Sequence, residues 1–178
     1  MRKSSLIAAG VLFALLSLPS QADEAPSVTA LKTVGEGQFS YLFWDLYQAR
    51  LATSDGQFFS YQQNKPLLLE LTYQRDISKA DFVEATLDQW KAQQGSLQQR
   101  HRDWAAQLDK LWRDVKKGDR LACFLRADGL VEFSFNGQPL GLVEDPAFGA
   151  EFLDIWLGEK TTAPKLRIAL LGRNKNGS

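Results

Sequence analysis

Cysteine and histidine are almost absent from this chain of 178 residues, which contains one of each, Cys123 and His101. A single thiol cannot close a disulfide within the chain, and the sequence has no HxxE, HxH or CxxC spacing that would suit a metal site. Cys123 stands in an apolar run, which predicts a buried, unreactive thiol. His101 lies among apolar residues at helical spacing, so we expect it in or beside the core, and no G-x-S-x-G sequence suggests a catalytic triad. We therefore expect neither a metal nor a cofactor.

An excess of charge of one sign is also missing, because 21 basic residues balance 21 acidic ones. The first 22 residues contain two basic residues and no acidic one, so the rest of the chain has 19 basic residues against 21 acidic ones. This balance provides no basic surface for nucleic acid or for an anionic membrane, and we expect neither as a partner.

Long apolar runs are limited to the start of the chain. Two basic residues precede a small or apolar run over residues 6–16, and Ser20-Gln21-Ala22 suits a signal peptidase. The run is too short for a comfortable membrane span. We predict that residues 1–22 are a secretory signal peptide and that residues 23–178 form a single domain in the periplasm. No later segment is apolar enough to cross a bilayer, so we do not expect an integral membrane protein, and the oligomeric state stays open.

Tight-turn signals organise the region from Gly118 to Gly158. Asp128-Gly129 and Asn136-Gly137 separate three short apolar runs, which predicts an antiparallel meander over residues 121–127, 130–135 and 139–143. A helix should follow directly, with Asp145 as its cap, Pro146 in its first turn and Gly158 at its exit.

The remaining segments predict strands first and helices afterwards. Strands are expected at residues 28–34 and 38–43, joined by a turn at 35–37, and then at 45–53 and 66–73. Helices are expected from Ser78 to Gly95, from Leu97 to a stop at Gly118, and over residues 164–171. This order indicates the α+β class.

The meander followed by D-P-x-F and F-x-x-I-W-L-G resembles the bacterial chalcone isomerase-like family. Three further segments extend the resemblance over nearly the whole chain after residue 22: G-E-G-Q-F-S-Y-L-F-W-D-L-Y-Q-A-R-L at 35–51, L-E-L-T-Y-Q-R-D-I at 69–77 and A-L-L-G at 169–172. The resemblance implies an antiparallel sheet with a helical layer on one face and a ligand in the cleft between them.

The resemblance also implies where a site would lie. The plant enzyme cyclises a chalcone through an anionic phenoxide, which an arginine stabilises, and relatives that bind fatty acids hold the carboxylate with an arginine and a tyrosine from neighbouring strands. Tyr47 matches the tyrosine, but residues 35–40 contain no arginine. Gln38 is the nearest polar residue there and cannot neutralise an anion. Arg75, where a strand gives way to the helical layer, is the best alternative cation.

Trp90, Trp104 and Trp156 lie at helical spacing and belong either to the core or to the cleft. The predicted ligand-binding set, which contains no catalytic residue, is Tyr47, Gln38, Arg75, Trp90 and Trp104. We expect Tyr47 to face the interior near Trp90 or Trp104, with its hydroxyl as the polar end of a cavity. On that basis Tyr47→Phe should leave folding nearly unchanged.

Three functions remain open on the sequence. The chain is predicted to be an exported protein that binds a small apolar or amphipathic molecule, such as a lipid or fatty acid, without catalysis. The alternatives are an intramolecular lyase or isomerase that stabilises charge without a metal, and a periplasmic accessory protein that binds another protein.

Overall fold

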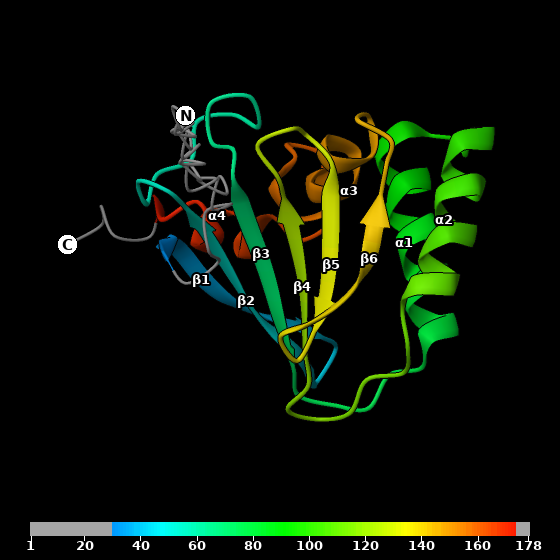
Figure 1. Cartoon of the computed structure of the whole chain (residues 1–178). Helices are drawn as coiled ribbons and strands as arrows, with labels where there is room; N and C mark the ends of the chain where they lie inside the picture. Colours follow the sequence, from blue (N-terminus) through cyan, green and yellow to red (C-terminus); the bar gives the residue numbers. More distant parts are fainter. Residues whose placement is uncertain (1–29, 174–178) are drawn as a thin grey trace, which may run out of the picture.

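A computed structural model describes residues 30–173, which form a six-stranded antiparallel sheet and four helices (Figure 1). The predicted signal peptide, the start of the first predicted strand and the last residues of the chain lie outside this range. The strands follow one another across the sheet in chain order and are β1 Lys32–Tyr41, β2 Trp44–Thr53, β3 Leu67–Tyr73, β4 Arg120–Leu125, β5 Val131–Phe135 and β6 Gln138–Val143. The helices are α1 Lys79–Gln94, α2 Gln99–Leu111, α3 Phe148–Leu157 and α4 Pro164–Leu170.

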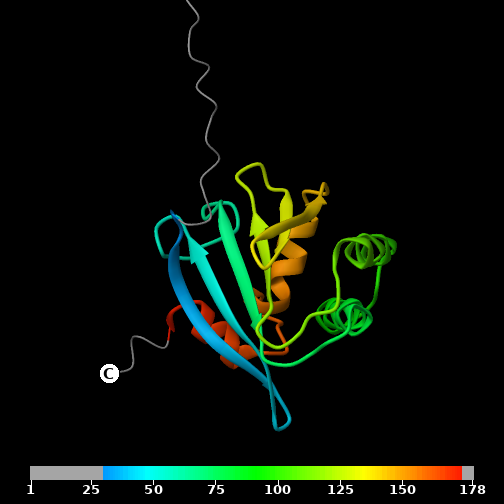
Figure 2. The same cartoon turned by 60° about the horizontal axis from the view of Figure 1, so that its bottom comes forward.

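All four helices lie on one face of the sheet, as Figures 1 and 2 show from two directions. The alternation of side chains along a strand decides which residues meet them. In β3, Leu69 and Leu71 are buried in the main core, whereas Leu68 lies in a small separate cluster on the other face. The α+β class and the helical layer on one face are therefore confirmed, as is the meander of β4, β5 and β6.

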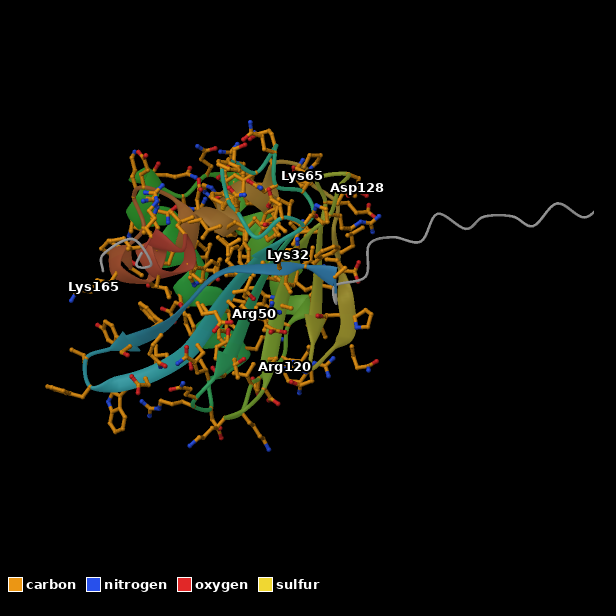
Figure 3. The ribbon with its side chains drawn as sticks, turned by 90° about the vertical axis from the view of Figure 1, so that its left-hand side faces the viewer. Lys32, Arg50, Lys65, Arg120, Asp128 and Lys165 are labelled. Carbon is orange, nitrogen blue, oxygen red and sulfur yellow. The ribbon has the colours of Figure 1, made fainter. Side chains whose placement is uncertain are left out.

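The other face of the sheet carries charged pairs. Glu70 lies 3.3 Å from Arg50 and 3.9 Å from Arg120, and both arginines are labelled in Figure 3. Because these guanidinium groups are engaged with Glu70 on the face that no helix covers, neither provides a cation to the space between the sheet and the helices.

The expected turn at residues 35–37 is wrong, because β1 runs unbroken through it and the chain reverses at Leu42 and Phe43. Because these glycines have no side chain, α4 can pack directly on the backbone of β1. A Cβ atom on Gly35 would lie 2.1 Å from the Ala169 carbonyl oxygen, and one on Gly37 would lie 2.7 Å from a methyl carbon of Leu166.

The helix boundaries follow local hydrogen bonds. Ser78 Oγ accepts from the Asp81 N–H at 3.2 Å and Gly95 ends α1 with φ of 80°, as predicted. The second helix is shorter than expected, because the chain leaves α2 after Leu111 and Val115 forms a bridge with Ile77. Within residues 30–173, no helix combines the length and apolar character needed to cross a bilayer.

Candidate functional site

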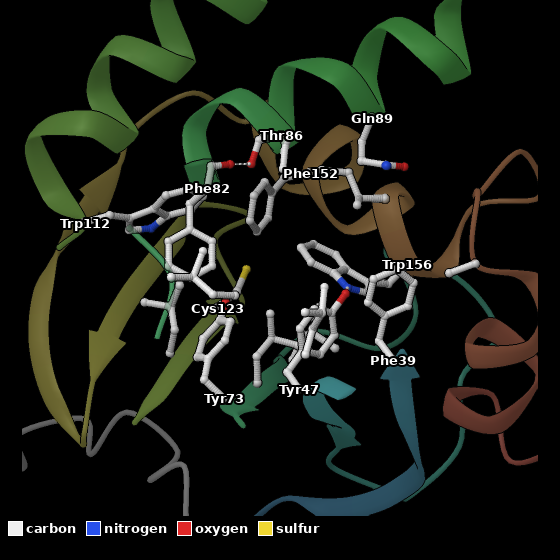
Figure 4. A pocket seen from close by; sticks show the side chains of 18 of the residues that line it. Phe39, Tyr47, Tyr73, Phe82, Thr86, Gln89, Trp112, Cys123, Phe152 and Trp156 are labelled. Carbon is white, nitrogen blue, oxygen red and sulfur yellow. Dashed lines mark hydrogen bonds between the residues drawn. The ribbon is translucent and has the colours of Figure 1, made fainter. Parts of the chain in front are cut away.

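A pocket of about 260 Å³ lies between the sheet and the helical layer. Its walls come from β1 to β5, α1, α3 and the segment before α4, and they are mainly apolar. Figure 4 shows Trp112 and Phe82 on one side of the space, and Trp156 and Phe39 on the other. An apolar pocket with few polar groups is the usual form of a small-molecule site.

Tyr47 lines this pocket from β2. Its ring stacks on Phe39 at 5.1 Å between centroids, and its hydroxyl oxygen accepts a hydrogen bond from Trp156 Nε1 at 2.9 Å. Burial raises the pKa of the Tyr47 phenol well above its usual range, so the hydroxyl stays protonated at neutral pH. Tyr47→Phe would take away the acceptor of the Trp156 N–H, so this contact favours a loss of stability over the nearly unchanged folding expected from the sequence.

Two further residues that line the pocket carry a hydrogen-bond donor without an acceptor from the described residues. Trp112 is 7% exposed, and its Nε1 is enclosed by neighbouring atoms and has no hydrogen-bond partner within residues 30–173. The Tyr73 hydroxyl forms no hydrogen bond with a described residue, and burial raises its pKa. Buried polar groups are normally paired, so unpaired donors around a cavity favour a ligand that accepts hydrogen bonds.

Cationic side chains are missing from the described lining. It contains no lysine, arginine or histidine, and its one charged side chain is that of Asp81. Cys123 also lines the pocket, but burial raises the pKa of its thiol, so the sulfur is a neutral, weakly polar part of the wall. Nothing among these side chains can neutralise a bound anion, and in residues 30–173 no three His, Cys, Asp or Glu side chains are grouped to hold a metal.

Gln38 and Arg75 lie outside the pocket. Gln38 points to the opposite face of the sheet from Phe39, where it exchanges hydrogen bonds with the side chain of Gln74 at 3.0 and 3.1 Å. Arg75 is exposed, and its guanidinium carbon lies 4.2 Å from the centre of the Trp44 ring. Of the two polar substitutes for the missing arginine, the structure brings neither to Tyr47.

Trp90 and Trp104 belong to the core, and neither lines the pocket. Trp90 stacks on His101 at 5.2 Å and donates to the Glu151 carbonyl oxygen at 3.1 Å. Trp104 donates to Asp145 Oδ2 at 2.9 Å. His101 is fully buried, as expected. Its Nδ1 accepts from the Gln98 N–H at 2.9 Å, which assigns the proton to Nε2, and Nε2 donates to Glu151. The indoles and the imidazole are satisfied by the protein itself.

Three residues that line the pocket were not predicted from the sequence as site residues. Tyr73 is the last residue of β3, and the sequence predicted this strand without indicating that Tyr73 belongs to a site. Trp112 was predicted to lie within a helix, but it follows the last residue of α2. Leu46 lines the pocket together with Tyr47 because a register shift leaves it unpaired between Asp45 and Tyr47. Trp156 was recognised as a candidate for the cleft, and the structure places it there.

Comparison with known proteins agrees with this architecture. A family model described as chalcone isomerase-like matches residues 31–172. A protein of Haemophilus influenzae described as uncharacterized is 24% identical over 147 residues, which covers 80% of this chain and 69% of that protein. A fatty-acid binding protein of Arabidopsis thaliana has a similar structure, with a TM-score of 0.62 and 13% identity, covering 81% of this chain and 88% of that one. The structural likeness shows that the two proteins share the fold. The chain belongs to the chalcone isomerase-like family.

Proposed function

We propose that this protein binds a small, uncharged apolar molecule that carries a hydrogen-bond acceptor, such as an acyl ester, aldehyde or ketone, and that it does so without catalysis. One observation carries the proposal: the pocket combines apolar walls with the phenol groups of Tyr47 and Tyr73, and its described lining contains no cation. The likeness to the Arabidopsis fatty-acid binding protein supports an apolar ligand in the same fold.

The volume of the pocket limits the size of the ligand. An engineered apolar cavity of ~150 Å³ accepts benzene, so a pocket of about 260 Å³ corresponds to roughly ten non-hydrogen atoms. A medium acyl chain or a single substituted ring fits this estimate. A two-ring chalcone exceeds it.

The charge of the lining favours a neutral ligand over a fatty-acid anion. Transfer of a carboxylate from water into a dry site costs several kcal/mol unless a cation or several donors compensate. The lining provides neutral donors and one acidic residue, Asp81, whose charge would repel the anion. An ester or ketone has no such cost, and its carbonyl oxygen can accept from Tyr47 while Tyr47 continues to accept from Trp156.

A matched pair of ligands tests this function. Isothermal titration of the protein with octanoate and with methyl octanoate at about pH 8, where the acid is ionised, should show at least tenfold tighter binding of the ester. Octanoate should gain affinity as the pH falls toward ~4 to 5 and the acid becomes neutral. Absence of binding for both compounds would refute the binding function, whereas equal or tighter binding of octanoate at pH 8 would refute only the preference for a neutral ligand. Native mass spectrometry of protein from its own host would identify a co-purifying molecule.

We also propose that the chain is exported to the periplasm. The basic residues at positions 2 and 3, the apolar run at 6–16 and Ser20-Gln21-Ala22 support cleavage after Ala22. N-terminal sequencing of protein from a periplasmic fraction should begin at Asp23. Intact Met1 on protein from the cytoplasm would contradict the proposal.

A further inference from the structure

The tip of the β1–β2 hairpin presents four consecutive large apolar side chains to solvent. Tyr41, Leu42, Phe43 and Trp44 are 63%, 76%, 97% and 57% exposed. Figures 2 and 3 show the end of this hairpin projecting beyond the rest of the protein. Single exposed apolar residues are common on protein surfaces, but a contiguous exposed patch of this kind usually marks an interaction site.

The backbone geometry of the turn does not explain why large apolar residues occupy this tip. Leu42 has φ of 55°, a conformation that is unfavourable for leucine and is normally given to glycine or asparagine. The chain uses the favourable pair in its β5–β6 hairpin, where Asn136 and Gly137 have φ of 51° and 81°. A leucine therefore occupies a turn position where it costs stability, and such a local cost is typical of functional positions.

We propose that this tip inserts into a lipid surface. Taking ~150–250 Å² for a full aromatic side chain, the four residues expose roughly 600 Å², which is less than the ~800 Å² that each partner buries in a stable protein–protein interface. A projecting tip can enter a bilayer without a matching groove. Tyrosine and tryptophan prefer the boundary between the lipid chains and the headgroups, and the Arg75 guanidinium, 4.2 Å from the Trp44 ring, lies where it can meet the phosphates.

The position of the tip relative to the pocket supports this partner. Phe39 and Leu46, which line the pocket, are each two residues from the exposed residues of the tip. A lipid surface is also a source of small apolar molecules, although insertion of the tip stands on its exposed side chains and does not depend on the ligand of the pocket. Since the chain has no excess of basic residues, the binding is apolar in origin, so zwitterionic vesicles suffice and salt has little effect.

The tryptophans of this chain provide a local test. Trp44 is 57% exposed, whereas the other four tryptophans are at most 8% exposed. Phosphatidylcholine vesicles that carry bromine on the acyl chains quench tryptophans only at close range. They should quench part of the fluorescence of the wild-type protein, and Trp44→Phe should abolish that quenching. If wild-type fluorescence is unchanged, or if the quenching persists in Trp44→Phe, the proposal is wrong.

A second variant separates loss of binding from loss of folding. The double substitution Leu42→Gly/Phe43→Asn removes the two most exposed side chains and places glycine at the position with positive φ, so it should fold at least as well as the wild type. It should reduce vesicle binding at least tenfold, whereas Phe59→Ser, at a 65% exposed phenylalanine in the β2–β3 loop, should leave binding unchanged. Equal loss in both variants would refute a role specific to the tip. A dimer that sediments in the wild type and is lost in the double variant would also overturn the proposal, in favour of a second copy as the partner.

Discussion

Replacement of Tyr47 by phenylalanine tests how the pocket is built, because it removes one oxygen atom and keeps the ring. In the wild type this oxygen accepts a hydrogen bond from Trp156 Nε1 at 2.9 Å, and Trp156 is 8% exposed. The variant retains the stacking on Phe39 but leaves a nearly buried indole N–H without an acceptor. An unpaired buried donor costs about 1–3 kcal/mol, whereas loss of a hydroxyl that has no partner costs little.

We expect Tyr47→Phe to lower the free energy of unfolding by about 1–2 kcal/mol, which corresponds to a fall in Tm of roughly 2–8 °C for a chain of this size. Tyr73→Phe is the matched control, since the Tyr73 hydroxyl forms no hydrogen bond with a described residue. Its cost should stay within about 0.5 kcal/mol. Binding of methyl octanoate should weaken by roughly two- to tenfold in Tyr47→Phe, the usual contribution of one neutral hydrogen bond.

A double-mutant cycle with Trp156→Phe measures the pair itself. If the hydrogen bond between Tyr47 and Trp156 is made in solution, the double variant should be more stable than the sum of the single losses predicts, by about 0.5–1.5 kcal/mol. The assay is urea denaturation followed by circular dichroism, with similar m values required in all four proteins. Additive losses, or a Tyr47→Phe variant as stable as Tyr73→Phe, would refute the reasoning.

Three further predictions concern packing, pH and catalysis. Gly35→Ala should cost at least ~2 kcal/mol in urea denaturation, because its Cβ would lie 2.1 Å from the Ala169 oxygen and α4 would have to move; unchanged stability would contradict this contact. Burial raises the pKa of Tyr47, Tyr61 and Tyr73 in the folded state, so above pH ~10 the unfolded chain loses protons that the folded chain keeps. Stability should therefore fall as pH rises above 10, by about 1.4 kcal/mol per pH unit for each tyrosine, and most phenolate absorbance should appear together with unfolding rather than before it. Hydroxylated chalcones should show no saturable cyclisation above buffer, and a saturable rate that changes with substitutions in the pocket would show that the protein is an enzyme.

Local signals in the sequence predicted much of the fold. Asp128-Gly129 and Asn136-Gly137 form the turns of the meander, and Ser78 and Gly95 bound α1 as their residue types indicated. The main error came from Gly35 and its neighbours, which resemble a turn in sequence. These glycines are there because α4, more than a hundred residues later in the chain, packs directly on the backbone of β1. A glycine selected for close approach and a glycine selected for positive φ look the same until the partner is known.

The candidate site was less predictable than the fold, because it depends on which tryptophans already have partners. Trp90 and Trp104 have the same helical spacing as Trp156, but Glu151 and Asp145 satisfy the first two from within the core. Trp112 reaches the pocket because the chain leaves the helix immediately before it and continues in an extended conformation, with ψ of 169°. Neither feature is encoded in the spacing of apolar residues, whereas Tyr47 was found because it matches the tyrosine that the family resemblance implies.

Because no arginine lies beside Tyr47, the pocket is suited to neutral ligands and not to anions. In an apolar pocket a guanidinium that binds no anion is itself a costly buried charge, so a site without one is stable empty and selective for neutral molecules. Here Tyr47 and Tyr73, whose burial keeps them protonated, remain donors across the neutral pH range. Affinity for a neutral acceptor should therefore be nearly constant between about pH 6 and 9, whereas a site that paired a carboxylate with a titrating group would not behave in this way.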